Sequence, residues 1–456
     1  MLDNKKLAGK RISVLGAGVS GRALAELARS LGAEVFVSDG KEIKQEVCAH
    51  FDELGIRYEM RGNTEKLLNA DEIVVGSGIP PKNEILAEAL ERGMNVIGEL
   101  DFVAPYLDGK IIGITGSNGK TTTTSMTGYF FEKLGRNVIT CGNIGVPVAK
   151  AAGRKYDFIV MELSSFQLYC VKEFMCDIAV VTNLAPDHID WHGSYENYVE
   201  SKANLIRFMN PNGTAIYQKC DEEKLGAGCK NILPLSWSSP ETNFGGLYMD
   251  KSSSAAWVSA GNGAAPSKLF DFDDVRLLGT HNLENTAMST AVLKRCGEDV
   301  SAEMIASYVP PKHRCAFAGK VNSITFVDDS KGTNVAASVT AMSSLPNKKV
   351  MILGGQGKGE EYGPLTDAVK KYAKYAVIID TEKEKISASL KEGGFEAYEL
   401  LSTMDEAVRT AYAKAAPGDT VLLSPACTSW DMYPNYGARG DDFCQVAREI
   451  IKEEEK

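Results

Sequence analysis

The sequence predicts an α/β protein with three domains, each built on a mainly parallel sheet. Short apolar runs alternate with glycine-rich turns and amphipathic stretches, which is the pattern of buried parallel strands joined by crossover helices. The chain has 456 residues, whereas a single hydrophobic core rarely organises more than about 250–300 residues. The apolar runs that we expect to be strands begin at residues 11, 71, 110, 157, 177, 349, 375 and 419.

Two segments divide the chain into the three predicted domains. A glycine-rich strand at residues 110–116 opens a new unit, and Pro310-Pro311 breaks the helical pattern before the last one. We therefore expect a Rossmann-like domain at 1–98, a central P-loop-type parallel sheet at 99–310 and a second Rossmann-like domain at 311–456. A stretch rich in serine, glycine and alanine within residues 219–268 is expected to form hairpins and loops on the central domain.

Composition excludes several classes of protein. The formal net charge of −10 argues against general nucleic-acid binding, although helix N-termini and local cations can still bind a phosphorylated ligand. No apolar run approaches the ~18 residues of a membrane span, and we expect no secretory signal at the N-terminus. The ten cysteines are scattered and lack the spacing of a disulfide framework or a zinc site. We expect a cytoplasmic protein that binds no membrane and no nucleic acid.

The first glycine loop is Gly16-Ala-Gly18-Val-Ser-Gly21, which follows a predicted strand and opens a predicted helix. With Asp39 at the end of the next strand it meets the dinucleotide-binding fingerprint. Physically, the pattern indicates a backbone that a phosphate can approach and a carboxylate that can accept from hydroxyl or N–H groups. Any diphosphate-linked nucleoside would fit it, and a tight turn with glycines for packing alone is the alternative.

The second glycine loop, GITGSNGKTT at residues 113–122, predicts an ATP site. It departs from the strict phosphate-loop pattern because Ile114 stands where the first glycine belongs. The chemistry is nevertheless present: a strand feeds a glycine-rich turn, Lys120 can meet the β- and γ-phosphate oxygens, and Thr121 can offer its hydroxyl to Mg²⁺.

A phosphate loop needs further oxygen ligands to complete the coordination of Mg²⁺. Glu162 ends the predicted strand DFIVME, at the edge where α/β sheets hold their ligands. Residues 182–192, TNLAPDHIDWH, follow the next strand and contain two carboxylates and two imidazoles. Lys202 shares a helical face with Tyr195 and Tyr198, and spacing alone favours a lysine that extends its ammonium group to solvent.

The runs GITGSNGKTTT, ELSSFQL and TNLAPDHIDWHGSYENYVESK together resemble the Mur ligase superfamily, whose members form amides at the expense of ATP and include the folylpolyglutamate synthases. Later blocks resemble its branch that joins D-glutamate to UDP-N-acetylmuramoyl-L-alanine, and the first glycine loop fits the uridine-binding domain of that branch. These blocks are HNLENTAMSTA (281–291), KHRCAF (312–317), DDSKGTN (328–334), GGQGKG (354–359) and SPACTSWDMYPNYGARGDDF (424–443).

The resemblance implies a set of ligand contacts, residue by residue. The catalytic residues are Lys120, Glu162, His188 and Lys202. The ATP contacts are Gly116, Ser117, Asn118, Gly119, Lys120, Thr121, Thr122, Asn282, Asn285, Arg314 and Asp329. The contacts to the UDP-linked substrate are Ser20, Asp39, Ser77, Asn143 and Gln167. The D-glutamate contacts are Lys331, Thr333, Lys358, Ser429 and Tyr436. The metal ligands are Thr121, Glu162, His188 and Lys202, the last as a carbamate formed from CO₂, around two Mg²⁺ ions.

The resemblance also implies a reaction. ATP phosphorylates the substrate carboxylate, the D-glutamate amine displaces the phosphate, and ADP and phosphate leave, in the synthesis of a cytoplasmic peptidoglycan precursor and hence in cell-wall growth, cell shape and cell division. We expect a monomer whose C-terminal domain closes over the site. Two positions depart from the pattern, because Trp430 stands where a smaller aliphatic residue is expected and Tyr436 where phenylalanine is expected.

Three other interpretations remain open on the sequence alone. A nicotinamide-dependent dehydrogenase would use the first glycine loop and leave the second idle. A regulatory ATP-binding module would not need the C-terminal SPACTSWD block. Within the superfamily, a folate ligase would not need the uridine-type loop, and ligases that add diaminopimelate or lysine usually carry a DNPR-like motif, which we do not find here.

Overall fold

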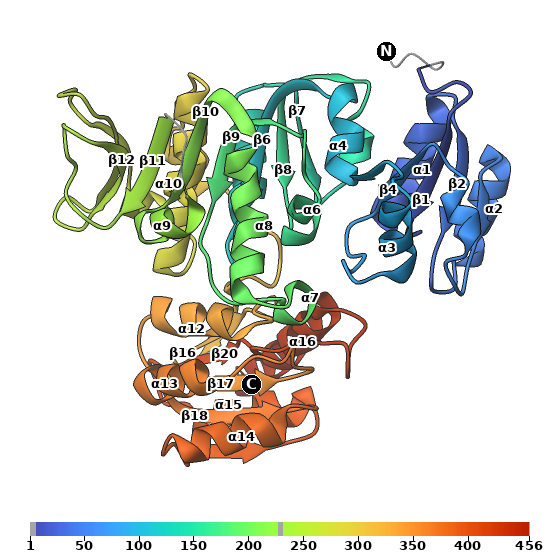
Figure 1. Ribbon diagram of the computed structural model, residues 1–456. Coiled ribbons are helices and arrows are strands. Elements are labelled where there is room, and N and C mark those ends of the chain that lie inside the picture. The colour runs from blue at the N-terminus through green and yellow to red at the C-terminus, as the bar shows by residue number, and fades with distance from the viewer. Residues whose placement is uncertain (1–5, 227–230, 456) are drawn as a thin grey trace.

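Three sheets, most of whose strand pairs are parallel, organise the protein, so the predicted α/β class is confirmed. The structure is a computed structural model that describes residues 6–226 and 231–455. Figure 1 is coloured along the chain, with the elements of the N-terminal sheet in blue, those of the central sheet in cyan to yellow and those of the C-terminal sheet in orange to red. All eight predicted strands coincide with observed ones: β1, β4, β6, β8, β9, β17, β18 and β20.

The N-terminal sheet is a five-stranded parallel sheet in the order β3-β2-β1-β4-β5. Neighbouring residues of a strand point to opposite faces, so Val14 packs on the side of α1 and Leu15 on the side of α3. The elements are β1 (Arg11–Leu15), α1 (Val19–Ser30), β2 (Glu34–Ser38), α2 (Gln45–Leu54), β3 (Arg57–Glu59), β4 (Glu72–Val75), α3 (Glu84–Glu91) and β5 (Val96–Gly98).

The central sheet has nine strands in the order β14-β13-β12-β11-β10-β9-β6-β8-β7. The elements of this part are α4 (Glu99–Val103), β6 (Asp108–Thr115), α5 (Lys120–Lys133), β7 (Val138–Gly142), β8 (Lys155–Glu162), α6 (Ser165–Tyr169), β9 (Cys176–Val181), α7 (Ile189–His192), α8 (Tyr195–Arg207), β10 (Met209–Gln218), α9 (Glu222–Leu225), β11 (Asn231–Ser236), β12 (Gly245–Asp250), β13 (Ala255–Ala260), β14 (Ser267–Asp271), α10 (Thr280–Arg295) and α11 (Ala302–Ala306).

Apolar residues cover both faces of the central sheet, which explains why its strands read as continuous apolar runs. Val180 packs with α5 and α10, whereas the next residue, Val181, faces the side of α8. Residues 231–271 do more than decorate this domain, because they add four strands to the sheet. Of these, β12, β13 and β14 form antiparallel hairpins at its edge.

The C-terminal sheet has six strands in the order β15-β16-β20-β17-β18-β19, and only the β15–β16 pair is antiparallel. Helices α12, α13 and α14 cover one face, and α15 and α16 cover the other. The elements are β15 (Ala316–Val321), β16 (Ile324–Asp328), α12 (Val335–Ser344), β17 (Lys349–Gly354), α13 (Gly363–Tyr372), β18 (Ala373–Ile379), α14 (Lys383–Glu392), β19 (Tyr398–Leu400), α15 (Met404–Lys414), β20 (Thr420–Leu423) and α16 (Tyr436–Glu454).

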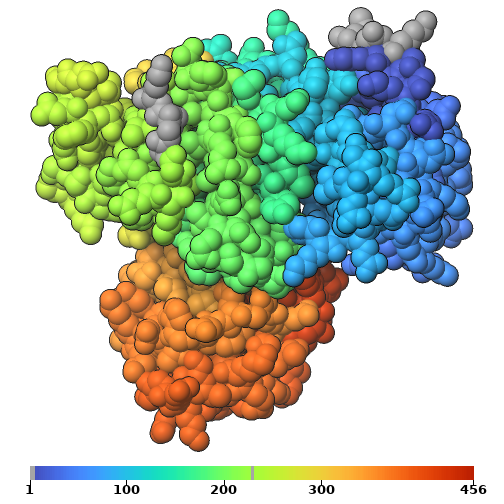
Figure 2. Space-filling model, in the orientation of Figure 1, coloured from blue at the N-terminus to red at the C-terminus, as the bar shows by residue number. Residues whose placement is uncertain are grey.

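The N-terminal and C-terminal parts of the chain lie on different sides of the central part (Figures 1 and 2). Figure 2 shows the C-terminal part (orange to red) beneath the central part (green), with the N-terminal part (blue) to the side. Within residues 6–226 and 231–455, no helix has the length and apolar character needed to cross a membrane.

Candidate active site

A cavity of about 510 Å³ lies between the central and C-terminal sheets. Its walls come from the loops that follow β6, β8 and β9 on one side and β16, β17 and β20 on the other, so the carboxyl ends of both sheets face it. Most of the predicted site residues line it: Ser117, Asn118, Gly119, Lys120, Thr121, Thr122, Asn143, Glu162, His188, Lys202, Asn282, Asn285, Arg314, Asp329, Lys331, Thr333, Lys358, Ser429 and Tyr436. Gly116 is next to this wall in the chain, whereas Ser20, Asp39, Ser77 and Gln167 are not among its lining residues.

The glycines of the second loop allow it to pack closely against its neighbours. Gly116 and Gly119 have φ angles of 141° and 82°, which other residues adopt only with strain. A Cβ atom would lie 2.0 Å from Thr182 Oγ1 at Gly116 and 2.5 Å from Asn285 Oδ1 at Gly119. The loop can therefore hold this shape only with glycine at both positions.

Asn183, which follows β9, fixes the same loop. Its backbone carbonyl accepts from Ser117 N at 2.8 Å and its side-chain oxygen accepts from Asn118 N at 2.9 Å. These two N–H groups are therefore already used. The N–H groups of the first turn of α5, residues 120–122, have no partner within the helix and are the ones suited to a phosphate.

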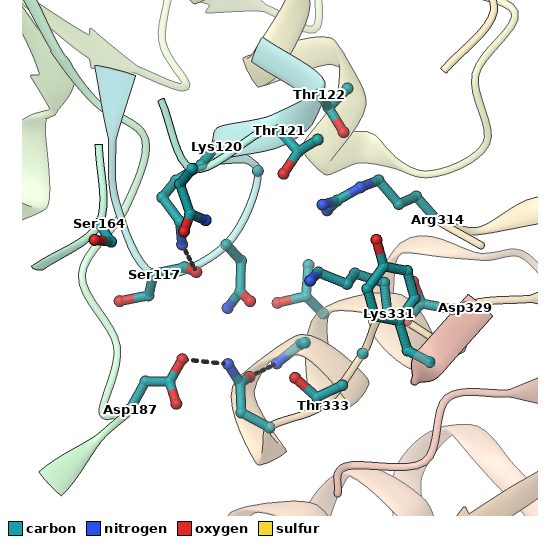
Figure 3. A pocket seen from close by; sticks show the side chains of 18 of the residues that line it. Ser117, Lys120, Thr121, Thr122, Ser164, Asp187, Arg314, Asp329, Lys331 and Thr333 are labelled. Carbon is teal, nitrogen blue, oxygen red and sulfur yellow. Dashed lines mark hydrogen bonds between the residues drawn. The ribbon is translucent and has the colours of Figure 1, made fainter. Parts of the chain in front are cut away.

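Lys120 and Lys202 bring two amino groups to this loop from different helices. Lys120 Nζ donates to the carbonyl oxygens of Gly116 and Ser117, at 2.8 and 2.7 Å, and the bond to Ser117 is drawn in Figure 3. Lys202 is 1% exposed, and its Nζ donates to Gly116 O at 2.8 Å and lies 4.6 Å from the ring centre of Tyr198. Neither lysine forms an ion pair with any residue of the described ranges. Burial lowers the pKa of both, that of Lys202 well below its usual value.

Glu162 carries a carboxylate oxygen that is available to a ligand. It ends β8 and is 1% exposed, and its Oε1 accepts from Asn143 Nδ2 at 2.7 Å. Its Oε2 is buried and has no hydrogen-bond partner among the described residues. A buried carboxylate oxygen without a donor is costly, so a cation bound there would stabilise it.

His188 stands on the same wall as a neutral imidazole. Its backbone is left-handed, with φ 53°, and its ring meets Phe166 edge-on with the ring centres 4.8 Å apart. Burial lowers the pKa of His188 to about 4, although Asp187 opposes this shift. At neutral pH the ring therefore keeps a lone pair that can bind a metal ion.

The residues 6–226 and 231–455 contain no group of three or more His, Cys, Asp or Glu side chains close enough to hold a metal ion. A cation at Glu162 and His188 would therefore depend on water or phosphate oxygens for much of its coordination. Such sparse protein ligation is usual for Mg²⁺ at a nucleotide site.

The C-terminal wall carries Lys331 and Asp329, and burial shifts the pKa of both side chains. Lys331 Nζ lies 4.1 Å from the ring centre of Tyr436, and burial lowers the pKa of this lysine to about 8. Asp329 accepts from Ser424 Oγ at 2.7 Å, and burial raises the pKa of Asp329 to about 7. Trp430 also lines the cavity and is 71% exposed, so its indole stands at the opening.

Asp187 joins the two walls, although it was not among the predicted site residues. Its Oδ1 accepts from Lys358 Nζ at 3.1 Å and its Oδ2 accepts from Asn334 Nδ2 at 3.1 Å; the latter bond is drawn in Figure 3. It is 6% exposed. The pattern TNLAPDH had pointed to this loop, but not to a bond with a lysine that lies far along the chain.

Asn285 and Asn282 extend the cavity along α10. Asn285 Oδ1 accepts from Thr123 Oγ1 at 3.3 Å, and its Nδ2 donates to Asn282 Oδ1 at 3.1 Å. This links α10 to the helix that starts with Lys120. The predicted ATP contacts on the phosphate loop and those on α10 therefore form one continuous surface.

Three of the residues predicted to contact the UDP-linked substrate gather around Glu99, which sequence reasoning missed. Gln167 Nε2 donates to Glu99 Oε1 at 2.5 Å, and Ser77 N donates to Glu99 Oε2 at 3.3 Å. Ser20 is linked to Ser77, with their hydroxyl oxygens 3.4 Å apart. Glu99 is 3% exposed, and burial raises its pKa.

Asp39 holds the first glycine loop. Its Oδ2 accepts from Ala17 N at 2.7 Å and its Oδ1 accepts from Lys41 N at 2.8 Å. In this structure both carboxylate oxygens therefore accept from N–H groups of the chain itself. A contact of Asp39 with the UDP-linked substrate stays a prediction.

The chain is similar to known proteins along nearly its whole length. Three family models match in order: the MurD N-terminal domain at residues 11–85, the Mur ligase middle domain at 114–293 and the Mur ligase glutamate ligase domain at 313–427. The UDP-N-acetylmuramoylalanine–D-glutamate ligase of Thermoanaerobacter pseudethanolicus is 36% identical over 458 aligned positions, which cover 98% of this chain and 99% of the relative. The chain belongs to the Mur ligase family. The enzyme of the same name from Streptococcus sanguinis is also 36% identical, over 97% of this chain and 98% of the relative.

Solved Mur ligases share the fold at lower identity. The UDP-N-acetylmuramate–alanine ligase of Thermotoga maritima is 17% identical with a TM-score of 0.57, over 97% of this chain and all of that one. The MurF ligase of the same organism, in complex with ADP, is 16% identical with a TM-score of 0.58, over 99% of this chain and 97% of that one. The three-sheet architecture is therefore that of the family.

Proposed function

We propose that this Mur ligase joins D-glutamate to UDP-N-acetylmuramoyl-L-alanine and converts ATP to ADP and phosphate, a step in the synthesis of a peptidoglycan precursor in the cytoplasm. One observation carries the proposal. A single cavity is lined both by the phosphate loop at Lys120 and by the cations Lys331 and Lys358 of the C-terminal loops. The full-length likeness to D-glutamate ligases supports the choice of substrates.

The chemistry needs an activated acid. A carboxylate is a poor electrophile because oxide is a poor leaving group, whereas an acyl phosphate expels phosphate readily. Transfer of the γ-phosphoryl group of ATP to the alanine carboxylate forms this acyl phosphate and releases ADP. The D-glutamate amine then attacks the carbonyl carbon, loses a proton, and expels phosphate as the amide forms. Positioning and charge compensation supply most of the catalysis in such transfers.

The lining residues suit these roles. Lys120 and the first turn of α5 face the phosphates, and Asn282, Asn285, Arg314 and Asp329 surround the rest of ATP. Lys331, Lys358, Thr333, Ser429 and Tyr436 offer cations and hydroxyls to the carboxylates of D-glutamate. Asn143 lines the same cavity and is proposed to contact the UDP-linked substrate, together with four residues outside this lining: Gln167, Ser20, Asp39 and Ser77.

Glu162, His188 and Thr121 fit one or two Mg²⁺ ions. The unpaired Oε2 of Glu162, the neutral imidazole of His188 and the cavity-facing hydroxyl of Thr121 are donors that such a cation accepts. When bound, Mg²⁺ offsets negative charge on the phosphate oxygens. The chain itself orients these donors through Asn143 and Phe166.

Lys202 suits conversion to a carbamate. Its amino group is buried, lacks a carboxylate partner among the described residues and lies beside Lys120. A neutral amine can attack CO₂ and lose a proton, which forms an N–C bond and leaves a carbamate anion. That anion would bring two oxygens to the cation site in place of a positive charge.

The C-terminal domain closes over its substrates in this proposal. Lys358 is bonded to Asp187 in this structure, so a D-glutamate carboxylate has to take the place of the Asp187 carboxylate. Closure would also keep water from the acyl phosphate.

Phosphate release from ATP, measured with each combination of substrates, tests the proposal. We expect release only when both UDP-N-acetylmuramoyl-L-alanine and D-glutamate are present, and little with L-glutamate. Release without an amino acid would contradict the ligase assignment, and a response to NADH without ATP turnover would favour the dehydrogenase.

A further inference from the structure

Arg439 is a fully buried cation outside the cavity wall. It lies on α16 and is 0% exposed, yet it forms no ion pair with a residue in the described part of the chain. Its guanidinium group instead donates to four backbone carbonyls and one hydroxyl. The acceptors are Thr428 O at 3.1 Å, Gly354 O at 3.5 Å, Ser330 O at 2.9 Å, Cys427 O at 3.0 Å and Ser330 Oγ at 3.0 Å.

The acceptors of Arg439 belong to three different loops at one edge of the C-terminal sheet. Ser330 follows β16, Gly354 ends β17, and Cys427 and Thr428 follow β20. The same three loops carry cavity residues proposed to hold D-glutamate: Lys331 and Thr333 on the β16 loop, Lys358 on the β17 loop and Ser429 on the β20 loop. Of these, Lys331 and Ser429 are direct neighbours of acceptors in the chain.

The loops are built around the guanidinium group. Gly355 has φ 134°, and a Cβ atom there would lie 2.1 Å from Thr428 O and 3.0 Å from Arg439 Nη1. Two backbone bonds also join Gln356 to Thr428, at 3.0 and 2.9 Å. The β17 and β20 loops are thus held together, and Arg439 connects both of them to the β16 loop.

Only arginine has the geometry for this task. Its planar group presents five N–H donors in fixed directions, whereas a lysine ammonium is a compact point charge that cannot span three loops. Burying a cation that is not in direct contact with a carboxylate is costly. Such a cost is balanced only when many donors are satisfied together, as they are here.

We infer that Arg439 is a positioning residue for the amino-acid pocket: it fixes the three strand-end loops relative to one another so that Lys331, Lys358 and Ser429 converge on the incoming amino acid. The inference rests on the proposed function for the identity of that substrate. It does not make Arg439 a catalytic residue, because Arg439 is absent from the lining of the cavity.

The test compares Arg439→Lys with the wild type in steady-state kinetics and in amide hydrogen exchange. We expect KM for D-glutamate to rise at least tenfold while KM for ATP and for the UDP-linked substrate changes less than threefold. Exchange should accelerate together at residues 329–334, 354–359 and 427–430. Arg448→Lys, at an exposed position of the same helix, is the matched control and should change neither readout.

Ser330→Ala serves if Arg439→Lys does not fold, because it removes the hydroxyl acceptor of Arg439 together with the bond that this hydroxyl donates to Tyr436 O at 2.8 Å. We expect it to raise KM for D-glutamate by two- to fivefold. An equal rise of all three KM values, or unchanged exchange in the three loops, would overturn the inference. If wild-type protein releases no phosphate with D-glutamate, the proposed function fails, whereas the exchange experiment still decides whether Arg439 fixes the loops.

Discussion

Lys120 Nζ and Lys202 Nζ donate to the same atom, the carbonyl oxygen of Gly116, each at 2.8 Å. Two amino groups therefore converge on the loop that would hold the triphosphate. Their mutual repulsion adds to burial in lowering the pKa of Lys202. Two ammonium groups here would attract phosphate but repel Mg²⁺. Conversion of Lys202 to a carbamate anion would remove this repulsion at the proposed cation site.

Replacing Lys202 with alanine should abolish most activity, because it removes the carbamate oxygens proposed for the cation site. Short carboxylates such as formate or acetate should restore part of the turnover, since they can occupy the vacated space. Arg207→Ala, at an exposed position of the same helix, is the control. Full activity of Lys202→Ala without any additive would show that no carbamate is needed.

Replacing Lys120 with alanine should lower turnover at least about a hundredfold, because the developing charge on the transferred phosphoryl group loses its closest cation. The circular dichroism spectrum should stay unchanged, and Lys133→Ala, at the exposed end of α5, should behave as the wild type. Near-normal turnover in a folded Lys120→Ala protein would remove the phosphate-loop assignment.

Replacing Glu99 with glutamine should raise KM for the UDP-linked substrate about tenfold. Gln167 Nε2 donates to one oxygen of the Glu99 carboxylate and Ser77 N donates to the other. A glutamine side chain has a single acceptor oxygen and an NH₂ group, so one of the two donors would lose its acceptor. The unpaired donor costs about 1–3 kcal/mol. KM for ATP should change little, and the exposed Glu91→Gln is the control. Unchanged binding of the UDP-linked substrate would show that Glu99 only joins the two domains.

His192 should make stability depend on pH. It contacts Ser165 Oγ at 3.0 Å through Nε2, and burial lowers its pKa to about 4. The unfolded chain, with a pKa near 6.5, binds more protons than the native state between these values, so stability falls as the pH falls through this window. Compared with His192→Gln, the wild type should lose about 2 kcal/mol between pH 7 and pH 4.5. Denaturation curves that give the same loss of stability for the wild type and for His192→Gln between the two pH values would contradict this.

Local signals in the sequence were sufficient for much of the fold and of the phosphate loop. Apolar runs such as DIAVVTN become central strands because both faces of the sheet are covered, and GSNGKTT needs only its own glycines and the following helix. Glu162 could be predicted because a residue at a strand end is placed by that strand alone.

Contacts between distant segments could not be predicted in this way. The bond from Lys358 to Asp187 depends on how two domains meet, and the contacts of Glu99 depend on the junction between two sheets. Arg439 looks like an ordinary surface arginine of an amphipathic helix until three loops close around it. The exposure of Trp430 at the opening of the cavity likewise follows only from the tertiary structure.

The central claim is that the terminal phosphoryl group of ATP passes to the substrate carboxylate before the amine attacks. Incubation of the wild-type enzyme with ATP, D-glutamate and UDP-N-acetylmuramoyl-L-alanine labelled with ¹⁸O in its alanine carboxylate tests it directly by mass spectrometry. We predict that each phosphate released carries one ¹⁸O atom from that carboxylate. Amide product formed together with unlabelled phosphate would contradict the acyl-phosphate account.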